Sequence, residues 1–222
     1  MGSGFTGSFR PTSLGETSYA AFMLPGAITL VAVFAAIFSS ISVIEDRNEG
    51  WLQAALVSPA PRWSLAMGKI IGSSLVSFIQ SAVMLLAIPF LHIHASPAAI
   101  ALSLLALAAT SFAMTAMGFI FAWHSETTAA FHAVMNIVFM PMWLLSGAFF
   151  PPKADGGVWH AGFLTWLMRI NPLTWCTQAI RLPMLEGSAS AAAMWWLLAS
   201  CLFAIVMFAG AVFVVSRRVR AS

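Results

Sequence analysis

The chain has 222 residues, of which 60% are hydrophobic and 8% are charged, and its formal net charge at pH 7 is +3. Soluble globular domains carry about 25% charged residues, so this composition excludes that class and indicates an integral membrane protein. The Lys and Arg residues form no basic patch with interleaved aromatics, which gives no support to a nucleic-acid partner. The two cysteines, Cys176 and Cys201, are too few and too differently placed to indicate a disulfide framework.

The polar start of the chain lacks the apolar core of a signal peptide, and we expect residues 1–21 to form a loop. Five uncharged runs follow, each long enough as a helix to cross a bilayer core, which needs about 20 apolar residues. Barrel strands would be about ten residues long and alternating, and backbone polar groups in lipid must be paired internally. The sequence therefore predicts an all-α, polytopic fold with spans at residues 22–44, 70–91, 98–123, 127–150 and 189–215.

The loop between the first two spans combines a charged cluster with a short amphipathic helix, predicted over residues 48–57. Its apolar residues Trp51, Leu52, Ala55 and Leu56 fall within an arc of about 140° at the helical period. Acidic residues lie where the helix dipole favours them, and prolines end the helix. A helix resting on lipid headgroups has the same arc. Anionic lipid would repel the acidic cluster, so docking to a protein is the competing interpretation.

The segment 151–188, between the last two spans, contains short apolar pieces bounded by proline and aromatic residues. The run 163–168 is too short to span, and a second helical stretch follows Asn171 and extends to Ile180. Such pieces suit a re-entrant helical hairpin in the outer leaflet, with tryptophans at headgroup depth. An ordinary external loop with surface helices has the same features, and the sequence does not separate the two.

The basic cluster Arg217, Arg218 and Arg220 directly follows the last span and favours the cytoplasmic side for the carboxyl terminus. Five spans then place the amino terminus outside. With this orientation six Lys or Arg residues are inside and four are outside. Residues 1–21 and 151–188 are therefore expected to be external.

Four segments, in this order, resemble the ABC-2 type permease family, the membrane subunits of bacterial ATP-driven exporters. They are Phe-Met-Leu-Pro-Gly at 22–26, the charged segment 45–52 with Ser58-Pro59, Ser-Gly-Ala-Phe-Phe-Pro at 146–151, and Asn-Pro-Leu-Thr-Trp at 171–175 with Arg181. The resemblance covers essentially the whole chain and implies that residues 22–222 form the transmembrane domain. Family members have an interfacial helix and six spans, so the resemblance also implies that this helix and the first span are absent from the sequence.

The resemblance further implies partners and a location in the bacterial cytoplasmic (inner) membrane. The helix 48–57 would be a coupling helix that docks into a cytoplasmic ABC ATPase subunit, and a second permease subunit, expected to be another copy of this chain, would complete the complex. ATP and Mg²⁺ would be held by the ATPase, because the chain has no Gly-x-x-x-x-Gly-Lys-Ser/Thr loop; it would bind no cofactor and would not be an enzyme by itself. The residues expected at the ATPase interface are Glu45, Asp46, Arg47, Glu49, Trp51, Leu52, Leu56, Ser58 and Pro59.

In the family the pathway is lined mainly by the spans that correspond to 22–44 and 127–150. Polar residues at membrane depth usually face other helices or a cavity, although serines more often pack helices closely together. A proline in a span produces a kink, and methionine supplies an adaptable apolar surface. The residues expected along the pathway are Ser39, Ser42, Asn136, Met140 and Pro141. Few polar groups lie at membrane depth, so we expect a hydrophobic or amphiphilic cargo, such as a drug-like molecule, a lipid or a lipid-linked glycan.

Two other classes of protein fit parts of the sequence. A channel or a non-transporting membrane scaffold has the same composition, and it would lack an ATPase partner. A metal-dependent intramembrane hydrolase would need His92, His94, His124 and Glu126 together, but the predicted topology places the two pairs on opposite sides of the membrane. No His-Glu-x-x-His motif is present either, so a metal site is not expected.

Overall fold

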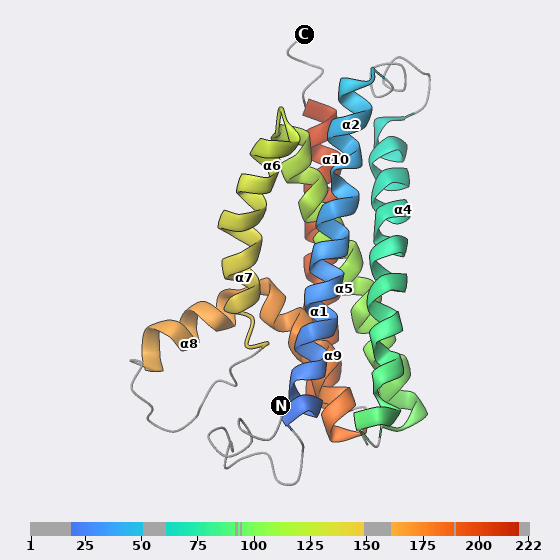
Figure 1. Cartoon of the computed structure of the whole chain (residues 1–222), viewed down its shortest axis with the longest axis vertical. Helices are drawn as coiled ribbons and strands as arrows, with labels where there is room; N and C mark the ends of the chain where they lie inside the picture. Colours follow the sequence, from blue (N-terminus) through green and yellow to red (C-terminus); the bar gives the residue numbers. More distant parts are fainter. Residues whose placement is uncertain are drawn as a thin grey trace.

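The computed structural model describes residues 19–50, 61–91, 93, 95–148, 161–188 and 190–217. Within these ranges all regular secondary structure is helical, which confirms the predicted all-α class. Figure 1 shows a bundle of long, roughly parallel helices from which one shorter helix projects sideways. In chain order the helices are α1 (Tyr19–Ser40), α2 (Ser42–Asn48), α4 (Arg62–Val83), η1 (Met84–Ala87), η2 (Pro89–Leu91), α5 (Pro97–His124), α6 (Thr128–Val134), η3 (Met135–Phe139), α7 (Met140–Leu144), α8 (Ala161–Ile170), α9 (Pro172–Glu186) and α10 (Ala191–Arg217).

Four helical stretches of the described residues are long and apolar enough to cross a membrane. They are Ala21–Asn48, Trp63–Leu91, Pro97–His124 and Ala191–Ser216. The first continues beyond the predicted end at residue 44, and the second begins well before the predicted start at residue 70. In both places the predicted span excluded charged residues through which the helix in fact continues. A helix can do so when the charged side chains reach the interface or find a partner.

The predicted fourth span, 127–150, is shorter than expected. Its continuous helical run is Thr128–Leu144, made of α6, η3 and α7. Seventeen residues of α-helix reach about 26 Å, less than a bilayer core of about 30 Å. The run stops because the chain leaves the helical conformation at Leu145 and turns at Gly147, whose φ of 72° is in the left-handed region.

The start of the predicted amphipathic helix at Asn48 is also wrong. Asn48 is the last residue of α2, and Gly50 has a φ of 80°, a left-handed conformation that ends helices. A helix therefore cannot run through Gly50. Residues 51–57, the remainder of that prediction, lie outside the described residues.

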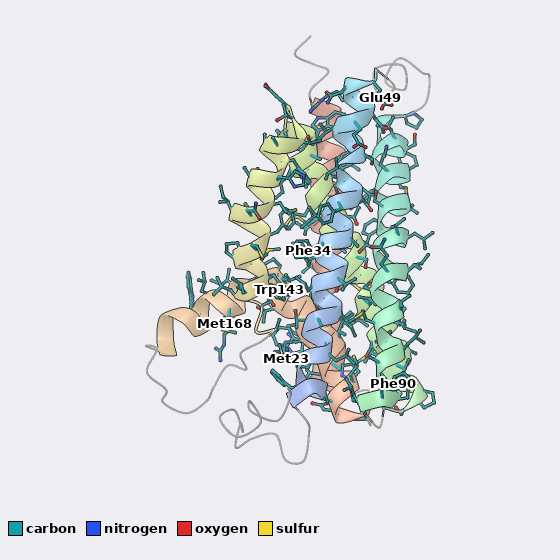
Figure 2. All side chains as sticks on the ribbon, in the orientation of Figure 1. Met23, Phe34, Glu49, Phe90, Trp143 and Met168 are labelled. Carbon is teal, nitrogen blue, oxygen red and sulfur yellow. The ribbon has the colours of Figure 1, made fainter. Side chains whose placement is uncertain are left out.

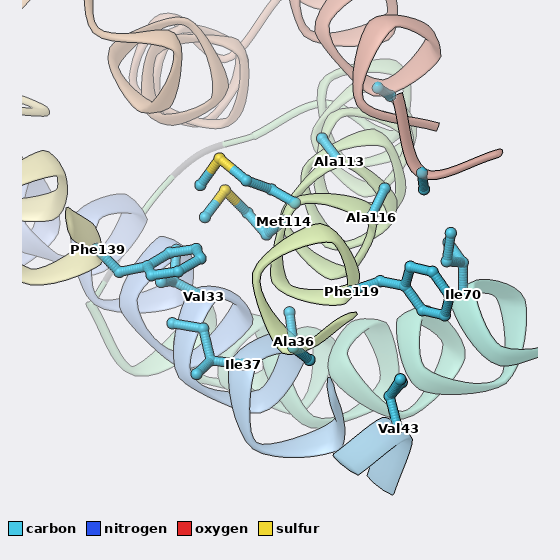
Figure 3. Close-up of a cluster of buried hydrophobic side chains, with 14 of the residues drawn as sticks. Val33, Ala36, Ile37, Val43, Ile70, Ala113, Met114, Ala116, Phe119 and Phe139 are labelled. Carbon is cyan, nitrogen blue, oxygen red and sulfur yellow. The ribbon is translucent and has the colours of Figure 1, made fainter. Parts of the chain in front are cut away.

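The helix α5 lies at the centre of the bundle and packs against α1, α4, α9 and α10. Figure 3 shows the resulting core: Phe119 of α5 points toward Ile70 of α4, and Phe139 of η3 lies beside Val33 and Ile37 of α1. Small residues allow the closest approach, since Ser40 of α1 occupies the space that a side chain at Gly118 of α5 would need.

The two ends of the bundle carry different connections. In Figure 1, α2, the turn from α5 to α6 and the end of α10 lie at one end, while the start of α1, the end of α4 and the turn from α9 to α10 lie at the other. The end of α5 and the start of α10 lie at opposite ends of the bundle. The chain covers the distance between them through α6, η3, α7 and α9.

Candidate functional site

An open groove of about 490 Å³ lies on the outer side of α1, near the middle of the bundle. Phe34 and Phe38 line it, with ring centroids 6.1 Å apart, and the Phe38 ring also lies 6.3 Å from that of His132 on α6. The groove is apolar except for Ser39 and Gln80. Its lining residues are Leu30, Val31, Phe34, Ala35, Phe38 and Ser39 of α1 and Gln80 of α4.

A narrow crevice adjoins this groove on the other side of Phe34. Val33 and Ile37 of α1 form one wall, and Met135, Phe139, Met140 and Trp143 from η3 and α7 form the other. Figure 2 shows Phe34 midway along the bundle, with Trp143 nearby. The groove, the crevice and the adjoining outer surface of η3 and α7 form one surface, which we call the α1 face.

A π-helical turn at Met135–Phe139 shapes one edge of the α1 face. The amide of Met140 donates to the carbonyl of Met135, five residues earlier in the chain. In an α-helix it would donate to the carbonyl four residues earlier. The cause is Pro141, which has no amide proton and whose ring would clash with the carbonyl four residues before it. Asn136 lies within this turn and is exposed, beside Ile137, which is 74% exposed.

The structure places the predicted pathway residues in different settings. Ser39 lines the groove, Met140 lines the crevice, and Asn136 and Pro141 are exposed on the adjoining helix. Ser42 lies elsewhere: its hydroxyl donates to the Ser39 carbonyl at 2.9 Å and accepts from Lys69 Nζ at 3.3 Å.

Gln80 was not predicted from the sequence, although it is exposed and lines the groove. It interrupts an apolar span with an amide, and that is the signal that could have identified it.

The end of α2 carries the charged residues that the sequence assigned to an ATPase interface. Glu45 and Glu49 are exposed, and Figure 2 shows Glu49 at the end of the bundle. Asp46 forms an ion pair with Lys69 of α4. The Arg47 guanidinium donates to the carbonyls of Trp123, at 3.1 Å, and Ser125. The other predicted interface residues, Trp51, Leu52, Leu56, Ser58 and Pro59, lie outside the described residues.

Toward the other end of the bundle, three of the four sequence segments noted above meet. The side-chain amide of Asn171, before α9, donates to the Met142 carbonyl of α7 at 2.5 Å. Arg181 of α9 is buried, donates to the Ala148 carbonyl at 3.0 Å, and lies 4.3 Å from the centroid of the Phe22 ring. These contacts join α1, α7 and α9 and so hold the crevice wall against the bundle.

The described residues contain no group of three or more His, Cys, Asp or Glu side chains that could hold a metal ion. Glu126 is exposed, and Nδ1 of His124 lies 2.8 Å from the Ile120 carbonyl of its own helix. His92 and His94 lie outside the described residues.

Comparison with known proteins matches residues 2–185 to the family model described as "ABC-2 type transporter". The chain is 28% identical over 202 residues to "Putative transport permease ycf38" of Cyanophora paradoxa, covering 90% of this chain and 65% of that protein. It is 30% identical over 168 residues to "Probable multidrug ABC transporter permease YbhR" of Escherichia coli K12, covering 74% of this chain and 44% of that protein. The chain thus spans less than two thirds of the length of each relative. The family match covers most of the chain, and the protein belongs to the ABC-2 type transporter family.

Proposed function

We propose that this protein is a membrane subunit of an ATP-driven exporter and that two copies enclose a pathway between their α1 faces. The observation that carries the proposal is the exposure of two amides, Gln80 and Asn136, on α4 and η3 at either side of α1. An amide facing hydrocarbon without a hydrogen-bond partner costs several kcal/mol, about 4–8 on a cyclohexane scale. A second copy or an enclosed pathway would supply partners that lipid does not.

The chemistry of the α1 face suits an amphiphilic cargo. Stacked phenylalanines and methionines offer an apolar, adaptable surface, while Ser39 and Gln80 offer hydrogen bonds at two points of the groove. The relative from Escherichia coli carries the word multidrug in its name, which agrees with a drug-like or lipid-like substrate. Export from the cytoplasm is the expected direction.

The complex would lie in the bacterial inner membrane, with α2 and the carboxyl end of α10 on the cytoplasmic side. The chain then makes five crossings, the fourth made by α6, η3 and α7 and completed in the outer leaflet by α9. The helices α8 and α9 would form the re-entrant segment of the outer leaflet: Figure 1 shows α8 lying across the bundle axis, and its Trp166 is 58% exposed. The exposed Glu45 and Glu49 would contact an ATPase subunit, which would hold ATP and Mg²⁺.

The proposal is tested by purifying the permease with the phosphate-loop ATPase that accompanies it and reconstituting both in vesicles. Movement of a hydrophobic fluorescent dye should require ATP and should stop when the ATPase's catalytic carboxylate is replaced. A channel would pass the dye without ATP, and a scaffold would pass none. Cross-linking of a single cysteine at Leu144, exposed on α7, should give a homodimer if the two α1 faces meet.

A further inference from the structure

The guanidinium of Arg47 connects α2 to the turn between α5 and α6. It donates to the carbonyls of Trp123 and Ser125, which belong to the last turn and the C-cap of α5. Carbonyls at a helix carboxyl end have no partner within the helix and carry the negative end of its dipole, so a cation there is favoured. The planar guanidinium of arginine can donate to two such carbonyls at once. The single ammonium group of lysine is less suited to this.

A second contact joins α2 to α4. Asp46, the neighbour of Arg47, pairs with Lys69 of α4, and the same Lys69 Nζ reaches the hydroxyl of Ser42 at 3.3 Å. Buried Val43 and Ile44 add apolar contacts along the helix. The end of α2 is therefore linked to α4 through Asp46 and Lys69 and to the α5–α6 turn through Arg47.

The α5–α6 turn is short and is continued directly by the helix that borders the α1 face. Thr127 caps α6, its hydroxyl accepting from the Ala130 amide at 3.1 Å, and α6 runs into the π-helical turn at Met135–Phe139. Motion of the turn at Ser125 is thus passed along a hydrogen-bonded helix rather than lost in a flexible loop.

We propose that Arg47 is a positioning residue that transmits movement of the α2 end to α6 and so to the α1 face. This inference rests on the proposed function, since the ATPase would supply the movement. It revises the role expected for Arg47 from the sequence: its charge is directed to the chain's own carbonyls, and the exposed Glu45 and Glu49 are left for the partner.

Spin labels test the connection directly in the complete permease–ATPase complex. Cysteines at Asn48 and Glu126, both exposed, report the distance between the α2 end and the turn; cysteines at Ala133 and Leu75 report the opening between α6 and α4. Cys176 and Cys201 are replaced by alanine, and labelled permease is diluted with unlabelled copies. Distances are compared without nucleotide and with ATP plus vanadate.

In the parent protein the 48–126 distance should be single and unchanged by ATP, while the 133–75 distance should shift. In Arg47→Gln the population with a longer 48–126 distance should rise about tenfold or more, because charge-assisted hydrogen bonds are lost, and the ATP-induced 133–75 shift should disappear. Arg169→Gln, on the exposed side of α8, should leave both distances unchanged. Arg47→Lys should give changes in both distances that lie between those of the parent protein and of Arg47→Gln. It serves as the test variant if Arg47→Gln does not fold.

Failure of this inference differs from failure of the proposed function. If ATP moves no distance in the parent protein, the proposed function is wrong, while the resting 48–126 distance still reports whether Arg47 holds the turn. If ATP shifts the 133–75 distance equally in the parent and in both Arg47 variants, Arg47 does not transmit the movement. An unchanged 48–126 distance in these variants would overturn the connection itself.

Discussion

Gly26 of α1 lies against Ala148, the residue that follows the turn at the end of α7, so closely that a Cβ atom at Gly26 would be 2.8 Å from the Ala148 carbonyl oxygen. It would also lie 2.9 Å from the Ala148 Cβ. Both are below van der Waals contact, and the obstacle is largely backbone, which cannot rotate away. The absence of a side chain at Gly26 therefore sets the distance between α1 and the segment that ends α7.

We predict that Gly26→Ala lowers the free energy of unfolding by about 1–3 kcal/mol, the usual cost of overpacking a close contact. Thermal unfolding of the purified protein in detergent measures it. Gly72→Ala on α4 is the matched control, because a Cβ there has nothing within 4 Å. That variant should be neutral or slightly stabilising, since alanine favours helix. Equal stability of the two variants would contradict the contact.

Buried Arg181 should contribute to the same junction. Arg181→Ala removes the hydrogen bond to Ala148 and the contact with the Phe22 ring, and it leaves a cavity. We expect a loss of about 2–4 kcal/mol of unfolding free energy. Arg181→Met, which keeps most of the volume, should lose less. Arg169→Ala, at an exposed position, should change stability by less than about 0.5 kcal/mol, so a loss as large as that of Arg181→Ala would exclude a specific role for the junction.

The long uncharged runs were sufficient to predict the long helices, because length and hydropathy determine what can cross a bilayer. They did not predict where helices end. The run 127–150 stays apolar to its end, yet the helix stops at Leu144 because Gly147 adopts a left-handed conformation that composition does not reveal. Similarly, charge marked the end of the first span at residue 44, whereas the helix continues to Asn48.

The residue types of the candidate site could be recognised in the sequence, but their contacts could not. Serine, methionine and asparagine at membrane depth were identified as candidates, and two of the five predicted pathway residues, Ser39 and Met140, line the groove and the crevice. The partners of Arg47 could not be predicted, because backbone carbonyls have no sequence signature. A charged residue in a loop is naturally assigned to an external partner until the structure shows which carbonyls it reaches.

Membrane orientation is the third prediction. Glu126, after α5, and Glu186, at the end of α9, lie at opposite ends of the bundle (Figure 1). In a background without Cys176 and Cys201, a cysteine at 186 should react with an impermeant maleimide in spheroplasts, in which the outer membrane no longer limits access. A cysteine at 126 should react only after the inner membrane is permeabilised. Reaction of both before permeabilisation would contradict the five-crossing topology, and the reverse pattern would invert it.

We predict that Pro141 maintains the π-helical turn. Pro141→Ala restores an amide proton, and relaxation of the turn to an α-helix would rotate α7 by about 100°, the angle of one residue. In single permease chains in detergent that lack Cys176 and Cys201, a cysteine at Leu144, which is 51% exposed in the single chain, should then lose reactivity toward a maleimide. A cysteine at exposed Ala133, before the turn, should react equally in both backgrounds. Retained reactivity at 144 would show that neighbouring contacts, rather than the proline, maintain the turn.

The exposed amides should affect cargo preference more than stability. Asn136→Leu and Gln80→Leu remove hydrogen-bonding groups from the α1 face without creating buried cavities, since both positions are exposed. Loss of one neutral hydrogen bond corresponds to about a 2–10-fold change in apparent affinity. We therefore expect such a loss for amphiphiles with hydrogen-bonding groups and little change for purely apolar ones. Cargo-stimulated ATP hydrolysis per folded complex, measured across a series of dyes of graded polarity, provides the comparison.

The matched controls are Ile137→Leu and Ile79→Leu, exposed neighbours on the same two helices that carry no hydrogen-bonding group. They should leave the order of dye preference unchanged. A graded shift in the two amide variants alone would place both amides along the pathway. If instead the leucine variants insert in larger amounts and are stimulated by every dye as the parent protein is, the amides contact neither cargo nor a polar pathway, and the pathway must lie away from the α1 face.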